Sequence, residues 1–110
     1  MQGEKMAELN IENNTGFITF KNEYKISDAA NLKKTMIEAV FNSNELKLKM
    51  QSDILFDASF LQLFSATLKT CGELNKRVYL ITDKADNLTY TLKGSGFKEF
   101  NLFELIEEEK

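Results

Sequence analysis

The residues with the clearest chemical capacity in this sequence are Asp57 and Ser59, a carboxylate and a hydroxyl two residues apart. They follow the apolar, strand-like segment 54–56 and precede a helical pattern over residues 61 to about 74. Asp and Ser are preferred at the start of a helix, where free backbone N–H groups and the positive end of the helix dipole favour an anion. We therefore expect Asp57 to be the N-cap of this helix and the segment to bind an anion or a protein partner.

The composition excludes most nucleophilic and metal-dependent chemistry. The 110 residues include no histidine and one cysteine, Cys71. The sequence therefore offers no Ser-His-Asp or Cys-His pair, no histidine metal ligand and no imidazole base, and a zinc site is excluded. A single cysteine cannot form an internal disulfide and fits a reducing compartment. We expect a cytoplasmic protein that is not an enzyme, with no catalytic residues, no metal and no cofactor.

Length and charge indicate one ordinary globular domain spanning residues 1–110. Apolar residues make up 43% of the chain and charged residues 28%, which suits a single core. The net charge is −3, with acidic and basic residues interspersed, and does not favour nucleic acid. No apolar run approaches the roughly 20 residues that span a bilayer, and the N-terminus lacks the apolar core of a secretory signal. We expect neither nucleic-acid binding nor membrane insertion.

Hydrophobic spacing predicts strands and helices that alternate along the chain. Residues 9–11 and 17–20 flank a turn at 13–16, which predicts a β-hairpin with positive φ at Asn14 and Gly16. A helix then runs from an N-cap at Ser27 to about Phe41, and a strand follows at 46–50. The helix at 61–74 is stopped by Asn75, and the next strand, at 77–82, is expected to be covered on both faces. A third helix is capped by Asp83 and closed by a turn at 94–96, before a last strand at 100–103. Residues 104–110 are expected to form an acidic, solvated tail with helical character.

The element order ββαβαβαβ(α) predicts an α/β fold in which right-handed crossovers connect parallel strands of a mixed β-sheet. Its core is expected to span residues 9–103. Leu61, Phe64 and Cys71 belong to the buried stripe of the second helix, which makes Cys71 a small core residue. Phe60 is then expected somewhat more as an exposed anchor for a partner than as a core residue, because Leu61 and Phe64 already fill that stripe.

The segment 56–64, Phe-Asp-Ala-Ser-Phe-Leu-Gln-Leu-Phe, resembles the motif of the STAS domain, the family shared by sulfate transporters and bacterial anti-sigma factor antagonists. In that family an apolar strand runs into Asp-Ser-Ser-Gly-Leu, or a variant such as Asp-Thr-Ala-Ala-Leu-Gln-Leu-Leu, which opens a helix. The hairpin, the helix and strand before the motif, and the third helix ending at Gly96-Phe97 match in order and spacing over residues 9–103. The resemblance implies a STAS-like single domain that binds proteins.

The resemblance also implies roles for individual residues. In anti-sigma factor antagonists, the second Ser of the motif accepts a phosphoryl group from a serine kinase that is also the binding partner. Ser59 falls on that position, which makes it the phosphoacceptor candidate. The residues expected to bind the partner are Asp57, Ala58, Ser59, Phe60 and Gln62. This chain departs from the motif in two places, because Ala58 replaces the first Ser or Thr and bulky Phe60 replaces a Gly or Ala.

Several functions remain open. The first is a regulatory module similar to anti-sigma factor antagonists, switched by phosphorylation of Ser59, since phosphate adds close to two negative charges at a docking surface. The second is a constitutive STAS subunit of a lipid-transport or chemotaxis-linked assembly, in which the Leu-Gln-Leu variant recurs and Ser59 is a plain helix-start serine. A small-ligand or nucleotide sensor is less favoured, because the sequence shows no cradle of glycines or basic residues. The oligomeric state is open.

Overall fold

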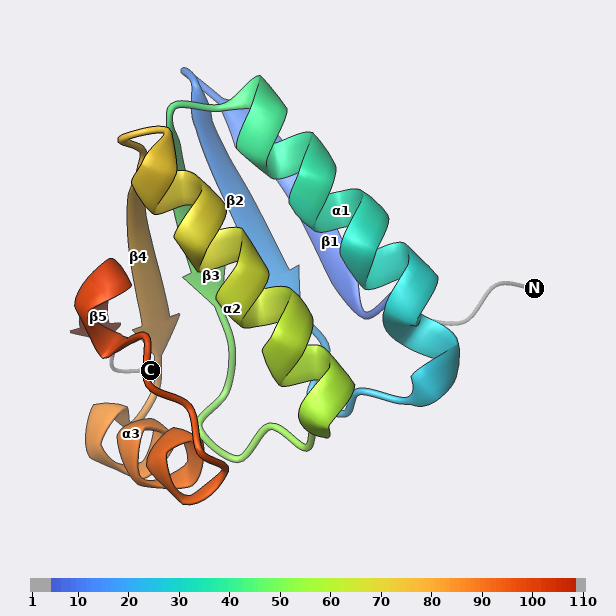
Figure 1. Ribbon diagram of the computed structural model, residues 1–110, viewed down its shortest axis with the longest axis vertical. Helices are drawn as coiled ribbons and strands as arrows, with labels where there is room; N and C mark the ends of the chain where they lie inside the picture. Colours follow the sequence, from blue (N-terminus) through green and yellow to red (C-terminus); the bar gives the residue numbers. More distant parts are fainter. Residues whose placement is uncertain (1–4, 109–110) are drawn as a thin grey trace.

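Residues 5–108 of the chain are described by a computed structural model. They form a five-stranded β-sheet with two long helices packed against one face and a shorter helix near one end (Figure 1). The strands are β1 (Ala7–Glu12), β2 (Thr15–Phe20), β3 (Glu45–Lys49), β4 (Arg77–Thr82) and β5 (Glu104–Glu107). The helices are α1 (Ala29–Asn42), α2 (Ala58–Glu73) and α3 (Ala85–Gly94), with short 3₁₀ turns at Ile26–Asp28 and Phe100–Leu102.

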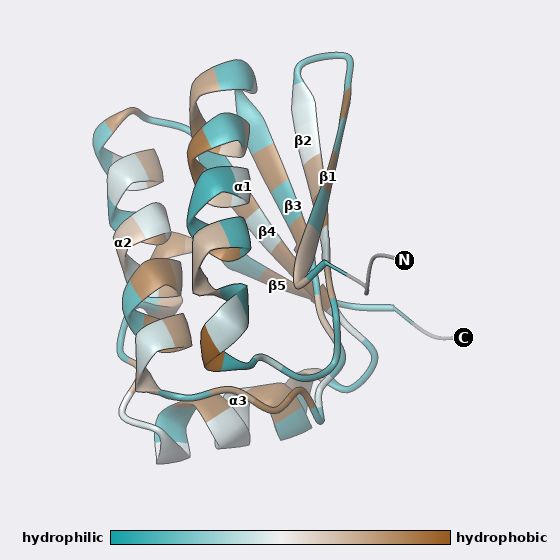
Figure 2. Ribbon diagram, turned by 90° about the vertical axis from the view of Figure 1, so that its right-hand side faces the viewer, coloured by the Kyte–Doolittle hydropathy of each residue, from teal (hydrophilic) through white to brown (hydrophobic). Residues whose placement is uncertain are grey.

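The sheet is mixed, with the strand order β1-β2-β3-β4-β5. β1 and β2 form an antiparallel hairpin, and each later neighbouring pair is parallel. Each parallel step passes through a helix, and α1 and α2 lie side by side on the same face (Figure 2). The predicted α/β class, the order ββαβαβαβ and the parallel pairing are confirmed.

The β1–β2 hairpin turns through Asn13 at φ 51° and Asn14 at φ 67°. Asparagine tolerates this left-handed region, and two such residues give the primed turn that suits twisted strands. The prediction for Asn14 is confirmed, but the one for Gly16 is wrong, because Gly16 lies inside β2 opposite Leu46 without positive φ. Glycine is required there for space, since a Cβ would lie 2.7 Å from Oγ of Ser43.

The chain enters α1 through the 3₁₀ turn at residues 26–28, and the predicted N-cap at Ser27 is wrong. Asp28 organises this entry instead. Its Oδ2 accepts a hydrogen bond from the Lys25 N–H at 2.7 Å, and its Oδ1 pairs with Nζ of Lys21 at 3.1 Å. A carboxylate displaces a hydroxyl from this role because its charge-assisted hydrogen bonds are stronger.

α2 ends at Glu73, and Asn75, which the sequence predicts as the residue that stops it, follows with φ 58°. The Asn75 N–H donates to the Gly72 carbonyl at 3.2 Å, and the Lys76 N–H donates to the Cys71 carbonyl at 2.8 Å. These two bonds form a Schellman motif, which satisfies carbonyls that the last turn would leave free. The Cys71 side chain is fully buried, as predicted, and burial raises the pKa of its thiol.

The helices cover one face of the sheet, and the other face carries no helix in the part of the chain that the structure describes (Figure 2). β4 therefore alternates: Val78 and Leu80 are buried, whereas Tyr79 and Ile81 are only half-buried. The prediction that this strand is covered on both faces is wrong. Lys47 from β3 supplies part of the cover, because its Nζ lies 5.9 Å from the centroid of the Tyr79 ring.

The C-terminal region differs most from the sequence-based expectation. Residues 100–102 form a 3₁₀ turn and not a strand, and residues 104–107 form strand β5 and not a solvated tail. Phe97, Phe100 and Phe103 recur every three residues and pack against one another with ring centroids 4.9–6.1 Å apart, which favours the turn. β5 then pairs with β4, so the core extends beyond residue 103. At the other end Met6 is fully buried and Ala7 starts β1, so the core also begins before residue 9.

Asp83 does not cap α3 as predicted, because Lys84 occupies the N-cap position and the Asp83 carboxylate points elsewhere. Its Oδ1 accepts from the Ser52 N–H at 2.8 Å and from the Thr82 hydroxyl at 3.2 Å. The bond from the Ser52 N–H is the main reason that the pKa of Asp83 lies below its ordinary value. Asp83 thus fixes the loop between β3 and α2 that leads into the predicted site.

Candidate functional site

The predicted site lies at the start of α2, at the carboxyl ends of the parallel strands, where sites of α/β folds commonly form (Figure 1). The segment before it, 54–56, forms a single bridge and not a strand. In this bridge the Leu55 N–H donates to the Asn22 carbonyl at 2.8 Å, and the Tyr24 N–H donates to the Leu55 carbonyl at 2.7 Å. The loop after β2 is thereby held next to the first turn of α2.

Asp57 is the N-cap of α2, as the sequence predicts. Its backbone is extended, with φ −126°, and its Oδ1 accepts from the N–H groups of Ser59 at 3.0 Å and Phe60 at 3.1 Å. The same oxygen accepts from the Ser59 hydroxyl at 2.7 Å. The hydroxyl bond first, and then the Phe60 N–H bond, keep the pKa of Asp57 below its ordinary value, so the carboxylate is ionised at neutral pH.

The Ser59 hydroxyl lies between two partners, because its Oγ is 2.7 Å from Oδ1 of Asp57 and 2.7 Å from the hydroxyl of Tyr24. A serine hydroxyl has one proton, and an ionised carboxylate only accepts hydrogen bonds. Ser59 therefore donates to Asp57 and accepts from Tyr24. The hydroxyl is held in one orientation while the residue stays half-exposed.

Phe60 is a core residue, and the expectation that it is an exposed anchor is wrong. Its side chain is 0% exposed. Four aromatic rings surround it with centroids 5.4–5.9 Å away: Phe20, Tyr24, Phe56 and Phe64. The buried stripe of α2 runs through Phe60, Phe64, Leu68 and Cys71 at helical spacing, whereas Leu61 is half-buried. The predicted stripe is confirmed at Phe64 and Cys71 and wrong at its first position, where Phe60 and not Leu61 faces the core.

The other residues predicted to bind a partner lie at the surface. Asp57, Ala58 and Gln62 are exposed. Ala58 and Gln62 line a shallow hollow between α2 and residues 95–99, where the Ser65 hydroxyl donates to Oε1 of Glu99 at 2.6 Å. Four of the five predicted positions are therefore within reach of a partner, with Phe60 as the exception.

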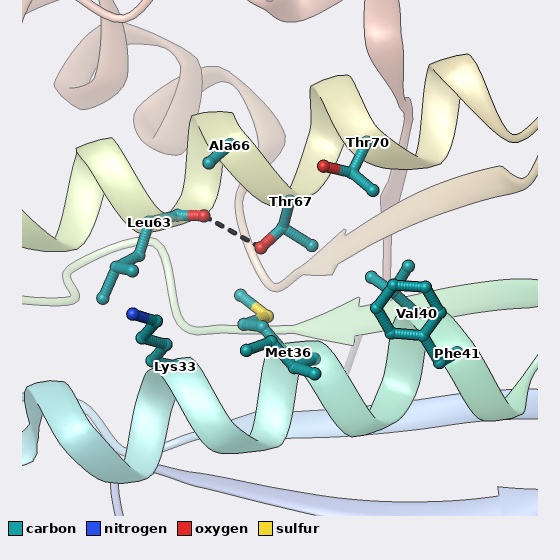
Figure 3. A pocket seen from close by; sticks show the side chains of 9 residues that line it. Lys33, Met36, Val40, Phe41, Leu63, Ala66, Thr67 and Thr70 are labelled. Atoms are coloured by element: carbon teal, nitrogen blue, oxygen red, sulfur yellow. Dashed lines mark hydrogen bonds between the residues drawn. The ribbon is translucent and has the colours of Figure 1, made fainter.

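A second hollow continues the face on which Ser59 lies. It runs between α1 and α2 with a volume of about 250 Å³ (Figure 3). Ser59, Leu63, Ala66 and Thr70 recur at i, i+4, i+7 and i+11, which places them on one stripe of α2. The residues lining the hollow are Lys33, Met36, Ile37, Val40, Phe41, Leu63, Ala66, Thr67 and Thr70. An apolar groove thus adjoins the Ser59 corner.

Sequence reasoning missed Tyr24, which lies 35 residues before Ser59. It stands in a polar connection without periodic spacing, so no local signal connects it with the helix start. The described residues hold no cluster of three or more acidic, cysteine or histidine side chains suited to a metal ion. Over the same residues, no helix is long and apolar enough to span a membrane.

Comparison with known proteins gives structural matches only, because neither a protein-family model nor a curated protein matches the sequence. The anti-sigma factor antagonist SpoIIAA in its unphosphorylated form aligns with a TM-score of 0.67 at 13% identity, over 93% of this chain and 89% of that chain. The Bacillus cell fate determinant SpoIIAA in its phosphorylated form aligns with a TM-score of 0.62 at 14% identity, over 93% and 92%. An anti-sigma-factor antagonist (STAS) domain protein from Planctomyces limnophilus aligns with a TM-score of 0.69 at 13% identity, over 96% and 92%.

These alignments span nearly the full length of each matched structure, and they agree with the order of strands and helices predicted from the sequence. At 13–14% identity they establish architecture and not residue roles. The chain has the fold of the STAS domain.

Proposed function

We propose that this chain is a non-enzymatic regulatory module of the cytosol that binds a protein partner at the start of α2 and is switched by phosphorylation of Ser59. The observation that carries the proposal is the half-exposed Ser59 hydroxyl, held 2.7 Å from the ionised Asp57 on a STAS fold. SpoIIAA, which has the same fold, is an anti-sigma factor antagonist whose phosphorylated form has been solved. The partner class we propose is accordingly an anti-sigma factor that is also a serine kinase.

The switch acts through charge. The exposed Asp57 already presents one negative charge at this corner. A phosphoryl group on Ser59 adds close to two more at neutral pH. A partner surface that docks against a single carboxylate then meets about three negative charges, and repulsion together with the desolvation of the phosphate releases it.

The groove between α1 and α2 gives the same partner an apolar surface to bury. Its floor includes Met36 and Val40, each 3% exposed, and its rim carries Phe41 at 68% exposure. The Thr67 hydroxyl donates to the Leu63 carbonyl at 2.8 Å, so this polar group is already paired within α2. A partner that contacts Ser59 can follow the same stripe of α2 and bury these side chains.

The test is a pull-down from lysate of the source cells with four baits: wild type, Ser59→Ala, Ser59→Asp and the control Asn10→Asp. Asn10 is exposed on the far face of the sheet, so Asn10→Asp adds the same charge away from the site. The switch predicts a partner that is retained by wild type, Ser59→Ala and Asn10→Asp and lost with Ser59→Asp. Equal retention by all four baits would refute the switch and favour the constitutive subunit of a lipid-transport or chemotaxis-linked assembly.

A further inference from the structure

We propose that Tyr24 is the residue that holds the phosphoryl group when Ser59 is phosphorylated. The assignment rests on the proposed function, because it concerns the modified state of the same serine. It follows from which hydrogen-bond donors around Ser59 are already in use, which contact the modification destroys, and which one survives.

The two helix N–H groups at and directly after Ser59 are occupied. Oδ1 of Asp57 accepts from the N–H groups of Ser59 and Phe60, and the Asp57 carbonyl accepts from the Leu61 N–H at 3.2 Å. The N–H groups that usually hold an anion at the start of a helix are here those of Asp57 and Ala58 and the two that the Asp57 carboxylate occupies. A phosphate on Ser59 would have to displace an ionised carboxylate to reach the Ser59 and Phe60 N–H groups, so a donor other than these two is needed.

Phosphorylation removes the bond between Ser59 and Asp57. A nucleoside triphosphate supplies the phosphoryl group: the Ser59 Oγ–H bond breaks, an Oγ–P bond forms, and the bond from the γ-phosphorus to the bridging oxygen breaks to release the diphosphate. The proton passes to the kinase or to solvent. Oγ, now an ester oxygen, has no proton to donate to Asp57, and the phosphate and carboxylate repel each other. The phosphate therefore turns away from Asp57.

The contact that survives is the one with Tyr24. Its hydroxyl already donates to Oγ at 2.7 Å, so a small rotation of the phosphoryl group brings one of its oxygens to the same donor. A hydrogen bond to a charged phosphate is stronger than the bond to a neutral hydroxyl that it replaces. Tyr24 thus changes from orienting the acceptor hydroxyl to holding the added group.

Tyr24 cannot easily withdraw from the phosphate. The residue is 6% exposed, and its ring packs edge-on against Phe60 with centroids 5.6 Å apart. Its N–H is bonded to the Leu55 carbonyl, which fixes the loop to the segment before α2. A donor held in place in this way restricts the phosphate to few orientations, and so defines where its charge stands against a partner.

The experiment uses full-length chain with phosphoserine installed at position 59 by stop-codon suppression, so no kinase is required. A ³¹P NMR titration measures the second pKa of the phosphate, which lies near 6 in the absence of specific contacts. A donor that favours the dianion lowers this value. We expect Tyr24→Phe to shift the titration to higher pH. The matched control Tyr90→Phe, with Tyr90 80% exposed on α3, should leave it unchanged.

The negative charge of Asp57 disfavours the phosphate dianion, which the Tyr24 hydroxyl favours. Asp57→Asn is therefore expected to shift the same titration to lower pH. The thermal unfolding midpoints of the unmodified variants verify that each is folded. Coincident ³¹P titrations of the Tyr24→Phe and Tyr24 chains would overturn the proposal. The proposal would also be overturned if the phosphate displaced Asp57 from the Ser59 and Phe60 amides. This would be seen as large shifts of both amide NMR signals on phosphorylation, with no shift of the Tyr24 signals.

The two proposals fail separately. Because phosphoserine is introduced during synthesis, the titration does not depend on whether cells phosphorylate Ser59. If Tyr24→Phe shifts the ³¹P titration to higher pH but all four baits retain the partner equally, the regulatory function is refuted and the contact between Tyr24 and the phosphate stands. If Ser59→Asp loses the partner but Tyr24→Phe leaves the ³¹P titration unchanged, the regulatory function stands and the contact is refuted.

Discussion

At the scale of single residues, one shared oxygen organises the candidate site. Oδ1 of Asp57 accepts from two backbone N–H groups and from the Ser59 hydroxyl, and thereby joins the cap of α2 to the phosphoacceptor candidate. A change at the Ser59 hydroxyl is therefore expected to change the pKa of the Asp57 carboxylate.

The first prediction concerns this coupling. The Ser59 hydroxyl is the largest cause of the lowered pKa of Asp57, so Ser59→Ala should raise that pKa towards its ordinary value. A carboxyl ¹³C NMR titration of both proteins measures the change. An Asp57 titration that is the same in both proteins would contradict the observed hydrogen bond.

A second prediction follows from the sign of the same shift. Folding lowers the pKa of Asp57, so its ionised form stabilises the fold above the unfolded-state pKa, and this contribution is lost as the pH falls through the folded-state value. Asp57→Ala should lower the midpoint of thermal unfolding by a few degrees at neutral pH. The difference from wild type should shrink as the pH falls through the lowered folded-state pKa of Asp57, measured by circular dichroism at a series of pH values. A difference independent of pH would mean that the charge of Asp57 does not act as the cap.

Phe60 provides a third prediction. Because this ring is fully buried among four aromatic neighbours, Phe60→Ala should lower the free energy of unfolding by about 3–5 kcal/mol. Phe41→Ala, at a ring that is 68% exposed, should change it by no more than about 0.5 kcal/mol. Urea denaturation separates the two. Similar small effects would return Phe60 to the surface and to the set of partner-binding residues.

At the scale of elements, contacts between segments decide two features that the local sequence pattern predicts wrongly. One is the contact between β2 and the end of α1, where Gly16 faces Ser43. The Ser43 hydroxyl donates to the Ala39 carbonyl and so stays directed at the helix end beside β2. The other is β5, in which Leu105 packs against the core and Ile106 lies on the open face.

The fourth prediction is a double-mutant cycle at the first contact. Gly16→Ala should cost about 1–3 kcal/mol, because the added Cβ meets the Ser43 oxygen. In a Ser43→Ala background the same substitution should cost clearly less, since that oxygen is gone. Urea denaturation of the four proteins gives the coupling energy. Additive effects would show that the clash is not with the hydroxyl.

The fifth prediction tests β5 as a strand. Leu105→Asp should destabilise the protein by about 1–3 kcal/mol, because it places a carboxylate against the core. Ile106→Asp, on the open face at 36% exposure, should have a smaller effect. Hydrogen exchange should show protected amides in residues 104–107, which pair with β4. Equal and negligible effects of both substitutions would restore the solvated tail predicted from the sequence.

At the scale of the whole molecule, α1 and α2 share one face of the sheet and leave a groove that begins one turn beyond Ser59 (Figure 3). If the partner follows this face, Ala66→Glu should weaken its binding by at least about tenfold, because a charge enters an apolar contact. Ala30→Glu, on an exposed position of α1 outside the lining, is the matched control. Titration calorimetry with the captured partner measures both, and unchanged binding by Ala66→Glu would limit the interface to the Ser59 corner.

The sequence by itself determined the elements whose causes are local. The left-handed Asn14 and Asn75, the Asp57 cap and the alternation of strands with helices each depend on a few neighbouring residues, and each is found as predicted. The motif around Ser59 also indicated the STAS fold.

Only the tertiary structure decided what depends on contacts between distant segments. It turned Phe60 inward, left one face of β4 without a helix and made a strand of residues 104–107, because burial is a property of the packed molecule and not of spacing alone. It also brought the Tyr24 hydroxyl to Ser59 across 35 residues. The neighbour that orients the phosphoacceptor candidate is set by loop pairing, which no local pattern encodes.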